Sequence, residues 1–266
     1  VLNELKLYGQ QGYKEVMLLG QNVNSYGNDN NNFDFADLLK RAGEILTIKR
    51  IRFMTSHPRD LSKKLIDVMA NTPSVMPHIH LPLQSGSDRI LKLMNRGYTT
   101  AQFLSLVKYA REKIPDISIT TDIIVGFPGE TEEDFIETLT FMGKICFDSA
   151  FTFQYSKRTG TPAAEFEDQI PQDVITRRFN QLVELQNSCS FASNQKILDT
   201  KQEILVEGIS DGNDDMLTGR SPHNRLVNFP VPFDKKNGKG NTKPDDFEGR
   251  IALVKIEQVK TFSLEG

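Results

Sequence analysis

Uncharged polar side chains gather where an apolar segment near the start of this chain ends. Residues 16–20 are apolar, and the segment QNVNS (21–25) follows at once with amides and a hydroxyl. A short apolar run is typical of a buried strand, and parallel α/β sheets bind ligands at the carboxyl ends of their strands. Amides there suit a polar organic ligand better than a bare anion or a metal ion. The alternative is a loop that uses asparagine for turns and helix capping.

A second polar segment follows the predicted strand 78–83 and begins with Gln84 and Ser85. Together with the amides of a following helix, such side chains can hold ribose or carboxylate groups. The alternative interpretation is ordinary helix capping by Ser87 or Asp88.

A third segment, GFPG (126–129), follows the predicted strand 117–125 and precedes Thr131, which is a predicted helix cap. Gly126 lets a flat ligand approach the backbone closely, so that backbone groups can read an adenine and Phe127 can stack on it. The alternative is a tight connection with Phe127 in the core. The similar segment 158–164 is either another loop of this kind or a domain linker.

The segment 219–229 near the other end of the chain combines two arginines, a histidine and two asparagines with Phe229. Arginines with interleaved amides and an aromatic ring suit RNA phosphates and unstacked bases. A solvated hairpin is the alternative. Because the formal net charge of the whole chain is only −3, a nucleic-acid site must be a local patch.

Strand and helix signals alternate over the first 155 residues, which predicts a parallel sheet that is either open or closed into a barrel. A long helix is predicted over 172–197. After residue 200, short β-branched segments separated by turns predict a small β-barrel. The predicted strands are 15–20, 50–54, 78–83, 117–125 and 151–155, with helices at 33–46, 61–70, 88–95, 100–114 and 131–145, and the later strands are 202–207, 216–220, 226–229 and 250–259.

Composition excludes several classes of protein. No segment approaches the roughly 18 consecutive apolar residues of a membrane span, and residues 1–14 do not resemble a signal peptide, so we expect a cytoplasmic location. The two cysteines, Cys146 and Cys189, do not form a CxxC pair and predict no metal site. We expect both to be buried as small apolar residues.

Taken together, seven segments resemble the tRNA methylthiotransferases of the radical S-adenosylmethionine (SAM) superfamily. The resemblance runs over essentially the whole chain, and the first two segments point to the branch that acts on N6-isopentenyladenosine beside the anticodon. The segments, in chain order, are LLGQNVNSYG, RIRFMTSHP, HLPLQSGSDRILKLMNRGYT, TDIIVGFPGETEEDF, YSKRTGTPAA, LVELQN and GRSPHNRLVNF.

The resemblance implies an α/β fold with a partial, TIM-like (β/α) radical-SAM barrel and its trailing helix over 1–197. A small all-β TRAM barrel that binds RNA would follow over 198–266. The family also holds two [4Fe-4S] clusters, one in an N-terminal domain and one on a CxxxCxxC loop after the first barrel strand. Neither cysteine set is in this chain, so we expect a piece of a longer enzyme that is inactive alone and holds no metal.

The resemblance assigns roles to residues at the strand ends, although no catalytic residue is identifiable. Gln84, Ser85, Gly126, Phe127 and Ser56 are predicted to bind SAM. Gln21, Asn22 and His57 are predicted to face SAM or the substrate base, and Arg220, Asn224 and Arg225 are predicted to contact RNA.

The implied reaction is radical methylthiolation at C2 of N6-isopentenyladenosine in a tRNA anticodon stem-loop, with flavodoxin or ferredoxin as electron donor. A missing first strand would leave a sheet edge open, which predicts self-association. Three alternatives remain: a cluster-free RNA-binding protein on the same scaffold, a methylthiotransferase of the threonylcarbamoyladenosine branch, and a metal-free barrel enzyme that uses Asp122 or Glu130 with His57 for acid–base chemistry.

Overall fold

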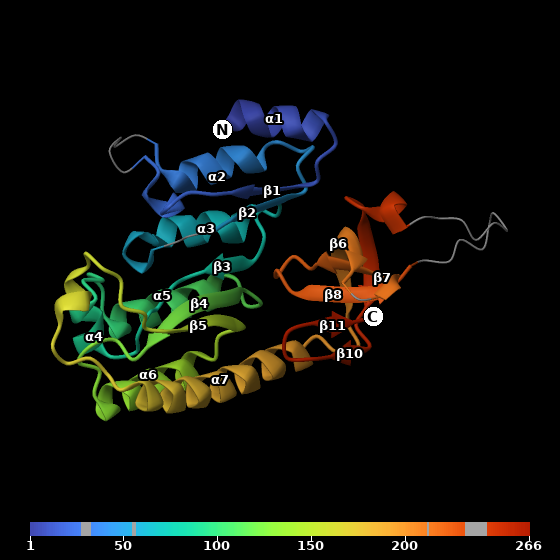
Figure 1. The fold of residues 1–266 in the computed structure, drawn as a ribbon. Coiled ribbons are helices and arrows are strands. Elements are labelled where there is room, and N and C mark those ends of the chain that lie inside the picture. Colours follow the sequence, from blue (N-terminus) through green and yellow to red (C-terminus); the bar gives the residue numbers. More distant parts are fainter. Residues whose placement is uncertain (28–32, 55–56, 212, 232–243) are drawn as a thin grey trace.

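The computed structural model describes residues 1–27, 33–54, 57–211, 213–231 and 244–266. Five parallel strands follow one another in chain order, as Figure 1 shows in blue to green. Strand β1 pairs with β2, and β3, β4 and β5 form a second parallel sheet. A bridge between Ile51 and Val75 connects β2 to the segment before β3. The strands are β1 (Glu15–Leu18), β2 (Arg50–Phe53), β3 (His78–His80), β4 (Ser118–Val125) and β5 (Ser149–Gln154).

Helices connect these strands, and their starts follow from the sequence. Asp34, Thr99 and Thr131 each form a capping box with the residue three positions later, and Ser62 caps with its hydroxyl. The α-helices are α1 (Leu2–Gln10), α2 (Phe35–Gly43), α3 (Lys63–Asn71), α4 (Asp88–Leu93), α5 (Thr100–Lys113) and α6 (Glu132–Ile145), and the short 3-10 helices are η1 (Val23–Ser25), η2 (Pro58–Asp60) and η3 (Pro162–Glu165).

The main apolar core lies between the parallel strands and the helices that cover them. Residues such as Leu39, Ile51, Phe103, Phe135 and Phe147 are at most 1% exposed, and each buried side chain of this size contributes about 1.5–3 kcal/mol. The α/β fold and the partial barrel predicted from the sequence are therefore confirmed. Among the described residues, no helix has the length and apolar character needed to cross a membrane.

Several predicted strands are shorter in the structure: the strand predicted over 15–20 ends at Leu18, and the one predicted over 250–259 is divided into β9 and β10. The sequence predicts a strand over 78–83, but β3 ends at His80. Pro82 has no backbone N–H, and the N–H of Leu83 donates to the side-chain hydroxyl of Thr121 rather than to a carbonyl of β4. The chain therefore leaves the regular ladder just before Gln84.

The C-terminal part is a curled sheet of six strands, drawn in orange and red in Figure 1, and the long helix α7 (Gln172–Gln195) leads into it. Ile204, Leu217, Val227 and Phe229 belong to its separate apolar core. The strand order is β10-β11-β8-β7-β6-β9. The elements are β6 (Lys201–Ser210), β7 (Asn213–Arg220), β8 (Leu226–Pro230), η4 (Pro244–Phe247), β9 (Ile251–Lys255), β10 (Gln258–Val259) and β11 (Leu264–Glu265).

Two buried arginines on β2 join the C-terminal sheet to the barrel. Arg50 donates to the carbonyl oxygens of Glu203 and Arg220, both at 2.8 Å. Arg52 donates to those of Ser221 and Pro222 at 2.7 and 2.9 Å. Both guanidiniums are almost completely buried and come from the amino-terminal half of the barrel. The sheet is therefore attached at the end of the barrel opposite to the strand ends discussed below.

The counter-ion of Arg52 is Glu15 on β1, with Nε and Oε1 2.9 Å apart. Replacing Arg52 by Met leaves the largely buried Glu15 with only the more distant Arg50, at 3.9 Å. We expect the free energy of unfolding to fall by about 3 kcal/mol in urea denaturation followed by circular dichroism.

The matched control is Lys64→Met, which removes an exposed ion pair with Asp34 and Asp37. Its expected effect is at most about 1 kcal/mol. Equal effects of the two substitutions would show that the buried arginine is not needed for the stability of the fold.

Candidate functional site

A cavity of about 810 Å³ opens at the carboxyl ends of β3, β4 and β5. Its walls combine aromatic rings with a few charged and amide side chains, as small-molecule sites do. The polar residues include Gln84, Arg96, Asp122, Gln154 and Arg158, and the aromatic ones are Phe127, Phe153, Tyr155 and Phe166.

Gln84 has the most constrained position in this cavity. Its backbone is left-handed, with φ of 73°, which costs about 1–2 kcal/mol for a residue with a side chain. The strain is held by two backbone hydrogen bonds to β4, from Gln84 to Asp122 and from Ile124 to Gln84. Its side chain is buried, and within the described part of the chain Oε1 has no hydrogen-bond partner. An unpaired buried amide oxygen is costly, so this atom suits a hydroxyl or N–H of a ligand.

The turn after β4 forms another wall of the cavity. Gly126 has a φ of +78°, and a Cβ there would lie 2.5 Å from Ile175 of α7. Its N–H donates to the carboxylate of Glu130 at 2.9 Å. Phe127 is buried and also lines the cavity, in edge contact with Tyr155. Phe127 is thus both a packed residue and a wall residue, whereas the sequence analysis treated these as alternatives.

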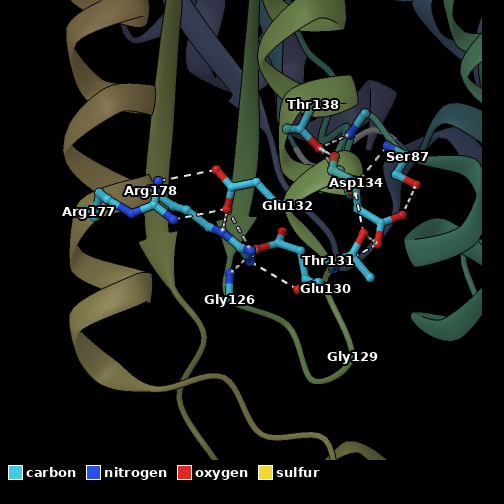
Figure 2. Close-up of polar contacts among 12 residues, drawn as sticks. Ser87, Gly126, Gly129, Glu130, Thr131, Glu132, Asp134, Thr138, Arg177 and Arg178 are labelled. Atoms are coloured by element: carbon cyan, nitrogen blue, oxygen red, sulfur yellow. Dashed lines mark hydrogen bonds and ion pairs between the residues drawn. The ribbon is translucent and has the colours of Figure 1, made fainter.

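A buried ion pair ties this turn to α7, as Figure 2 shows. Glu130 and Arg178 are 2.9 Å apart, and both side chains are at most 5% exposed. Arg178 also donates to the carbonyl of Glu130 and to Glu132. Burial raises the pKa of Glu130, while the Gly126 N–H and Arg178 oppose that shift. Glu130 is therefore occupied in holding the turn, which argues against the acid–base role considered from the sequence.

Asp134 at the start of α6 ties the turn to the segment that follows β3 (Figure 2). It accepts from the Ser87 hydroxyl at 2.7 Å, from Thr131 and from Arg89. Burial alone would raise the pKa of Asp134, but the hydrogen bonds from Arg89, Ser87 and Thr131 outweigh it and hold the pKa below its ordinary value. The Ser87 hydroxyl therefore does not cap α4, contrary to the simpler interpretation of the sequence.

Ser85 is placed behind the cavity wall rather than in it. Its hydroxyl is buried, 3.3 Å from the hydroxyl of Thr138, and accepts from the N–H of Ser87. The neighbouring Gly86 packs so closely on α6 that a Cβ would lie 2.6 Å from the Cα of Thr138. Ser85 thus fixes the loop that presents Gln84, and it is not among the residues that line the cavity.

The residues predicted at the first two strand ends are not brought to this cavity. Gln21 is exposed, and the amide of Asn22 donates to Asp60 at 2.5 Å. His57 accepts from the N–H of Arg59, and burial lowers its pKa. Ser56 lies outside the described residues.

The segment predicted to bind RNA lies at the junction between barrel and C-terminal sheet. Arg225 contacts Asp148 at 2.9 Å and Asn194 at 2.6 Å, and its side chain is only 14% exposed. Arg220 donates to the carbonyl of Asn224 and pairs with Glu207. The predicted RNA contact of Arg225 is at odds with this position, because its guanidinium is engaged inside the protein.

Comparison with known proteins identifies the family. Residues 1–142 match the profile of the Radical SAM superfamily, and residues 199–266 match that of the TRAM domain. The chain belongs to the radical SAM superfamily. A solved structure of coproporphyrinogen III oxidase from Escherichia coli, a radical SAM enzyme, has a similar fold, with a TM-score of 0.56, 13% identity and coverage of 83% of this chain and 58% of that one.

Two relatives within the superfamily are similar over all of this chain. Both are named tRNA-2-methylthio-N(6)-dimethylallyladenosine synthase. The protein from Acetivibrio thermocellus is 51% identical and that from Carboxydothermus hydrogenoformans is 50% identical. The chain covers 53% and 58% of their lengths, so it spans about half of each.

The sequence analysis missed several residues of the cavity in this radical SAM barrel. Asp122 was considered only for acid–base chemistry, and Arg96, Phe153 and Tyr155 were not singled out. The available signal was Asp122 itself, the one charged residue in the strand SITTDIIV. The others could not be found, because Arg96 reaches the cavity from the segment after α4 and only the fold brings it there.

The hydrogen bonds of Asp134 give a pH dependence that can be tested. Because its folded-state pKa lies below the unfolded value of about 4, its stabilisation is fully present above that pH and is lost as the pH falls below it. We expect Asp134→Asn to lower the free energy of unfolding by about 2 kcal/mol at pH 7. The difference from the unchanged protein should shrink progressively below pH about 4.

Glu133 is the matched control, since it is an exposed carboxylate in the same helix turn. Glu133→Gln should change stability by less than about 0.5 kcal/mol. Urea titrations at several values between about pH 3 and about pH 7 measure the free energy of unfolding of both variants. A difference for Asp134→Asn that does not vary with pH would contradict the ionic origin of its stabilisation.

Proposed function

We propose that the protein containing this chain transfers a methylthio group to C2 of N6-dimethylallyladenosine in tRNA, beside the anticodon. The observation that carries this proposal is the 50–51% identity to two synthases of that name over the whole chain. The TRAM match supports an RNA substrate. The cavity at the carboxyl ends of the strands supports a small organic cofactor.

In this proposal the chain has two working parts. Residues 1–197, the barrel with its trailing helix, hold the cofactor and the reacting base. Residues 198–266, the TRAM domain, bind the tRNA anticodon stem-loop. The change from α7 to β6 at residues 195–201 supports this division. Arg220 and Asn224 are retained as RNA contacts because they are partly exposed, whereas Arg225 is assigned to the junction.

The residues of the cavity fit SAM. The cationic groups of SAM match the carboxylate of Asp122. The ribose hydroxyls of SAM match the unpaired Oε1 of Gln84. The carboxylate of SAM matches Arg96, whose buried Nε has no partner in the described part of the chain. The adenine of SAM matches the aromatic wall at Phe127, and Gly126, whose N–H is held by Glu130, would shape the turn beside it. The chemistry that SAM would supply is radical activation of the substrate carbon and the methyl group of the product.

The remaining predicted residues take lesser roles. Ser85 would position Gln84 through the loop, and Gln21, Asn22 and His57 would face the substrate base from the first strands. Ser56 stays a prediction. The protein residues bind, orient and exclude water around the reacting atoms, and the strained backbone at Gln84 is held in place before any ligand arrives.

This chain cannot hold the iron–sulfur clusters of the proposed enzyme. A [4Fe-4S] cluster needs several thiolates, and the chain has two cysteines. Cys189 is buried as predicted, while Cys146 is only partly buried, and no cluster of three metal-ligating side chains occurs among the described residues. We propose that two clusters are held by residues outside this chain and are reduced by flavodoxin or ferredoxin in the cytoplasm. Self-association through the open edge of β1 remains a proposal.

Gln84 provides the test of the cofactor assignment. Gln84→Ala removes the buried amide oxygen, so we expect SAM to bind at least about tenfold more weakly. Isothermal titration of the cluster-loaded gene product, under anaerobic conditions, measures the dissociation constant. Gln195→Ala, at an exposed position on α7, is the control and should leave it unchanged. Equal affinity of the Gln84 variant and the unchanged protein would refute the assignment.

The reaction itself is tested separately. The gene product is incubated with SAM, a reductant and a stem-loop RNA that carries N6-dimethylallyladenosine, and the nucleosides are analysed by mass spectrometry. The 2-methylthio nucleoside is the expected product. Its absence from cluster-loaded protein that binds SAM would overturn the proposed function and leave an RNA-binding protein on this scaffold.

A further inference from the structure

Two large aromatic side chains face the inside of the barrel and remain half exposed. Phe151 is 56% and Phe153 is 50% exposed. In the parallel ladder Phe151 is the register partner of Asp122, and Phe153 is that of Ile124. Paired residues of neighbouring strands point to the same side of a sheet, and Asp122, Ile124 and Phe153 all line the cavity. Phe151 and Phe153 are therefore part of the inner wall.

The strand at the other end of the barrel, β1, carries exposed apolar side chains as well. Met17 on β1 and Leu19 just after it are separated by two positions, so they lie on one side of the strand. They are 44% and 73% exposed. Met17 is the register partner of Arg52, whose side chain enters the barrel from β2. We call Met17, Leu19, Phe151 and Phe153 the apolar trough.

A row of polar side chains runs between these walls. Asp122 is 3.4 Å from Nε2 of His80, and Nδ1 of His80 is 3.0 Å from the hydroxyl of Thr120. The same hydroxyl is 3.2 Å from His78. The ring of Phe151 makes an edge contact with His80. The inner surface thus offers hydrogen-bonding groups directly beside exposed apolar rings.

The TRAM domain covers the inside of the barrel at the amino ends of the strands. A smaller cavity of about 240 Å³ lies there, lined by Phe151, Thr120 and His78 from the barrel and by residues 223–226 from the TRAM domain. The backbone of residues 220–222 is fixed to Arg50 and Arg52. The trough therefore opens toward the large cavity and is covered at its other end.

We propose that the apolar trough binds the dimethylallyl group of the substrate base, with the polar edge of the base toward Asp122 and His80. This inference rests on the proposed function, and it assigns the residues that select the substrate. An isoprenoid group is uncharged and branched, and it gains from contact with Phe151, Phe153 and Met17. It continues directly from the cavity proposed for SAM, since Phe153 lines that cavity too.

The same wall disfavours the substrate of the sister branch. A threonylcarbamoyl group carries a carboxylate, which would lose its hydration against the phenyl rings and would lie near the carboxylate of Asp122. Burial of an unpaired charge is far more costly than burial of an alkyl group. The trough thus selects by attraction toward one group and by repulsion of the other.

The test compares two stem-loop RNAs that differ only in whether the target base is N6-dimethylallyladenosine or adenosine. Their dissociation constants are measured on the cluster-loaded gene product without turnover. We expect Phe153→Ala and Phe151→Ala to lower the preference for the dimethylallylated RNA by about tenfold, and Phe153→Leu to retain most of it. Phe191→Ala, on the exposed outer side of α7, is the control and should keep the full preference.

Two results would overturn the inference. In one, the phenylalanine variants keep the full preference for the dimethylallylated RNA, while the protein without substitutions still methylthiolates it. The proposed function would then hold without the role proposed for the apolar trough. In the other, both RNAs lose affinity equally, which would mean that the phenylalanines support RNA binding in general and do not select the dimethylallyl group. If the unchanged protein shows neither a preference nor a methylthiolated product, the proposed function itself fails.

Discussion

The buried ion pair between Glu130 and Arg178 is the interaction on which the rest of the structure depends. A buried carboxylate must be compensated, because an unpaired one would be strongly destabilising. Arg178 compensates it from α7 and so fixes the helix against the turn that borders the large cavity. The other end of α7 then determines where the TRAM domain lies, through Asn194, which donates to the carbonyls of Lys260 and Thr261.

The two ends of the barrel differ in what their buried polar groups bind. At the carboxyl ends of the strands, Gln84 and Arg96 have buried polar atoms without a hydrogen-bond partner among the described residues. At the amino ends, Arg50 and Arg52 use their donors on backbone carbonyls of the TRAM domain. Buried ionic contacts of this kind add less to stability than to the choice of one geometry. One end therefore carries the cavity proposed for the cofactor, while the other holds the TRAM domain at a fixed place.

Most of the architecture could be predicted from the sequence. The helix starts at Asp34, Thr99 and Thr131 follow from hydrogen bonds between residues at most four positions apart. Such starts can be predicted from the residue types in a short segment. The carboxyl end of β3 was also predicted as a ligand position, and Gln84 lies there. The neighbouring Ser85 could not be distinguished from it, because the direction of each side chain depends on how the loop packs against Thr138 of α6.

The segment 219–229 shows the limit of such reasoning most clearly. Its arginines and amides have the composition of an RNA site, yet Arg225 pairs with Asp148, which is 77 residues away in the chain. Composition determines that a guanidinium must find an acceptor, but it does not determine whether that acceptor is a phosphate or a carboxylate of the same molecule. The sequence by itself determined the strands, the helices and the chemical kinds of group at the strand ends. The tertiary structure alone decided which of those groups share a cavity, because that depends on contacts between residues far apart in the chain.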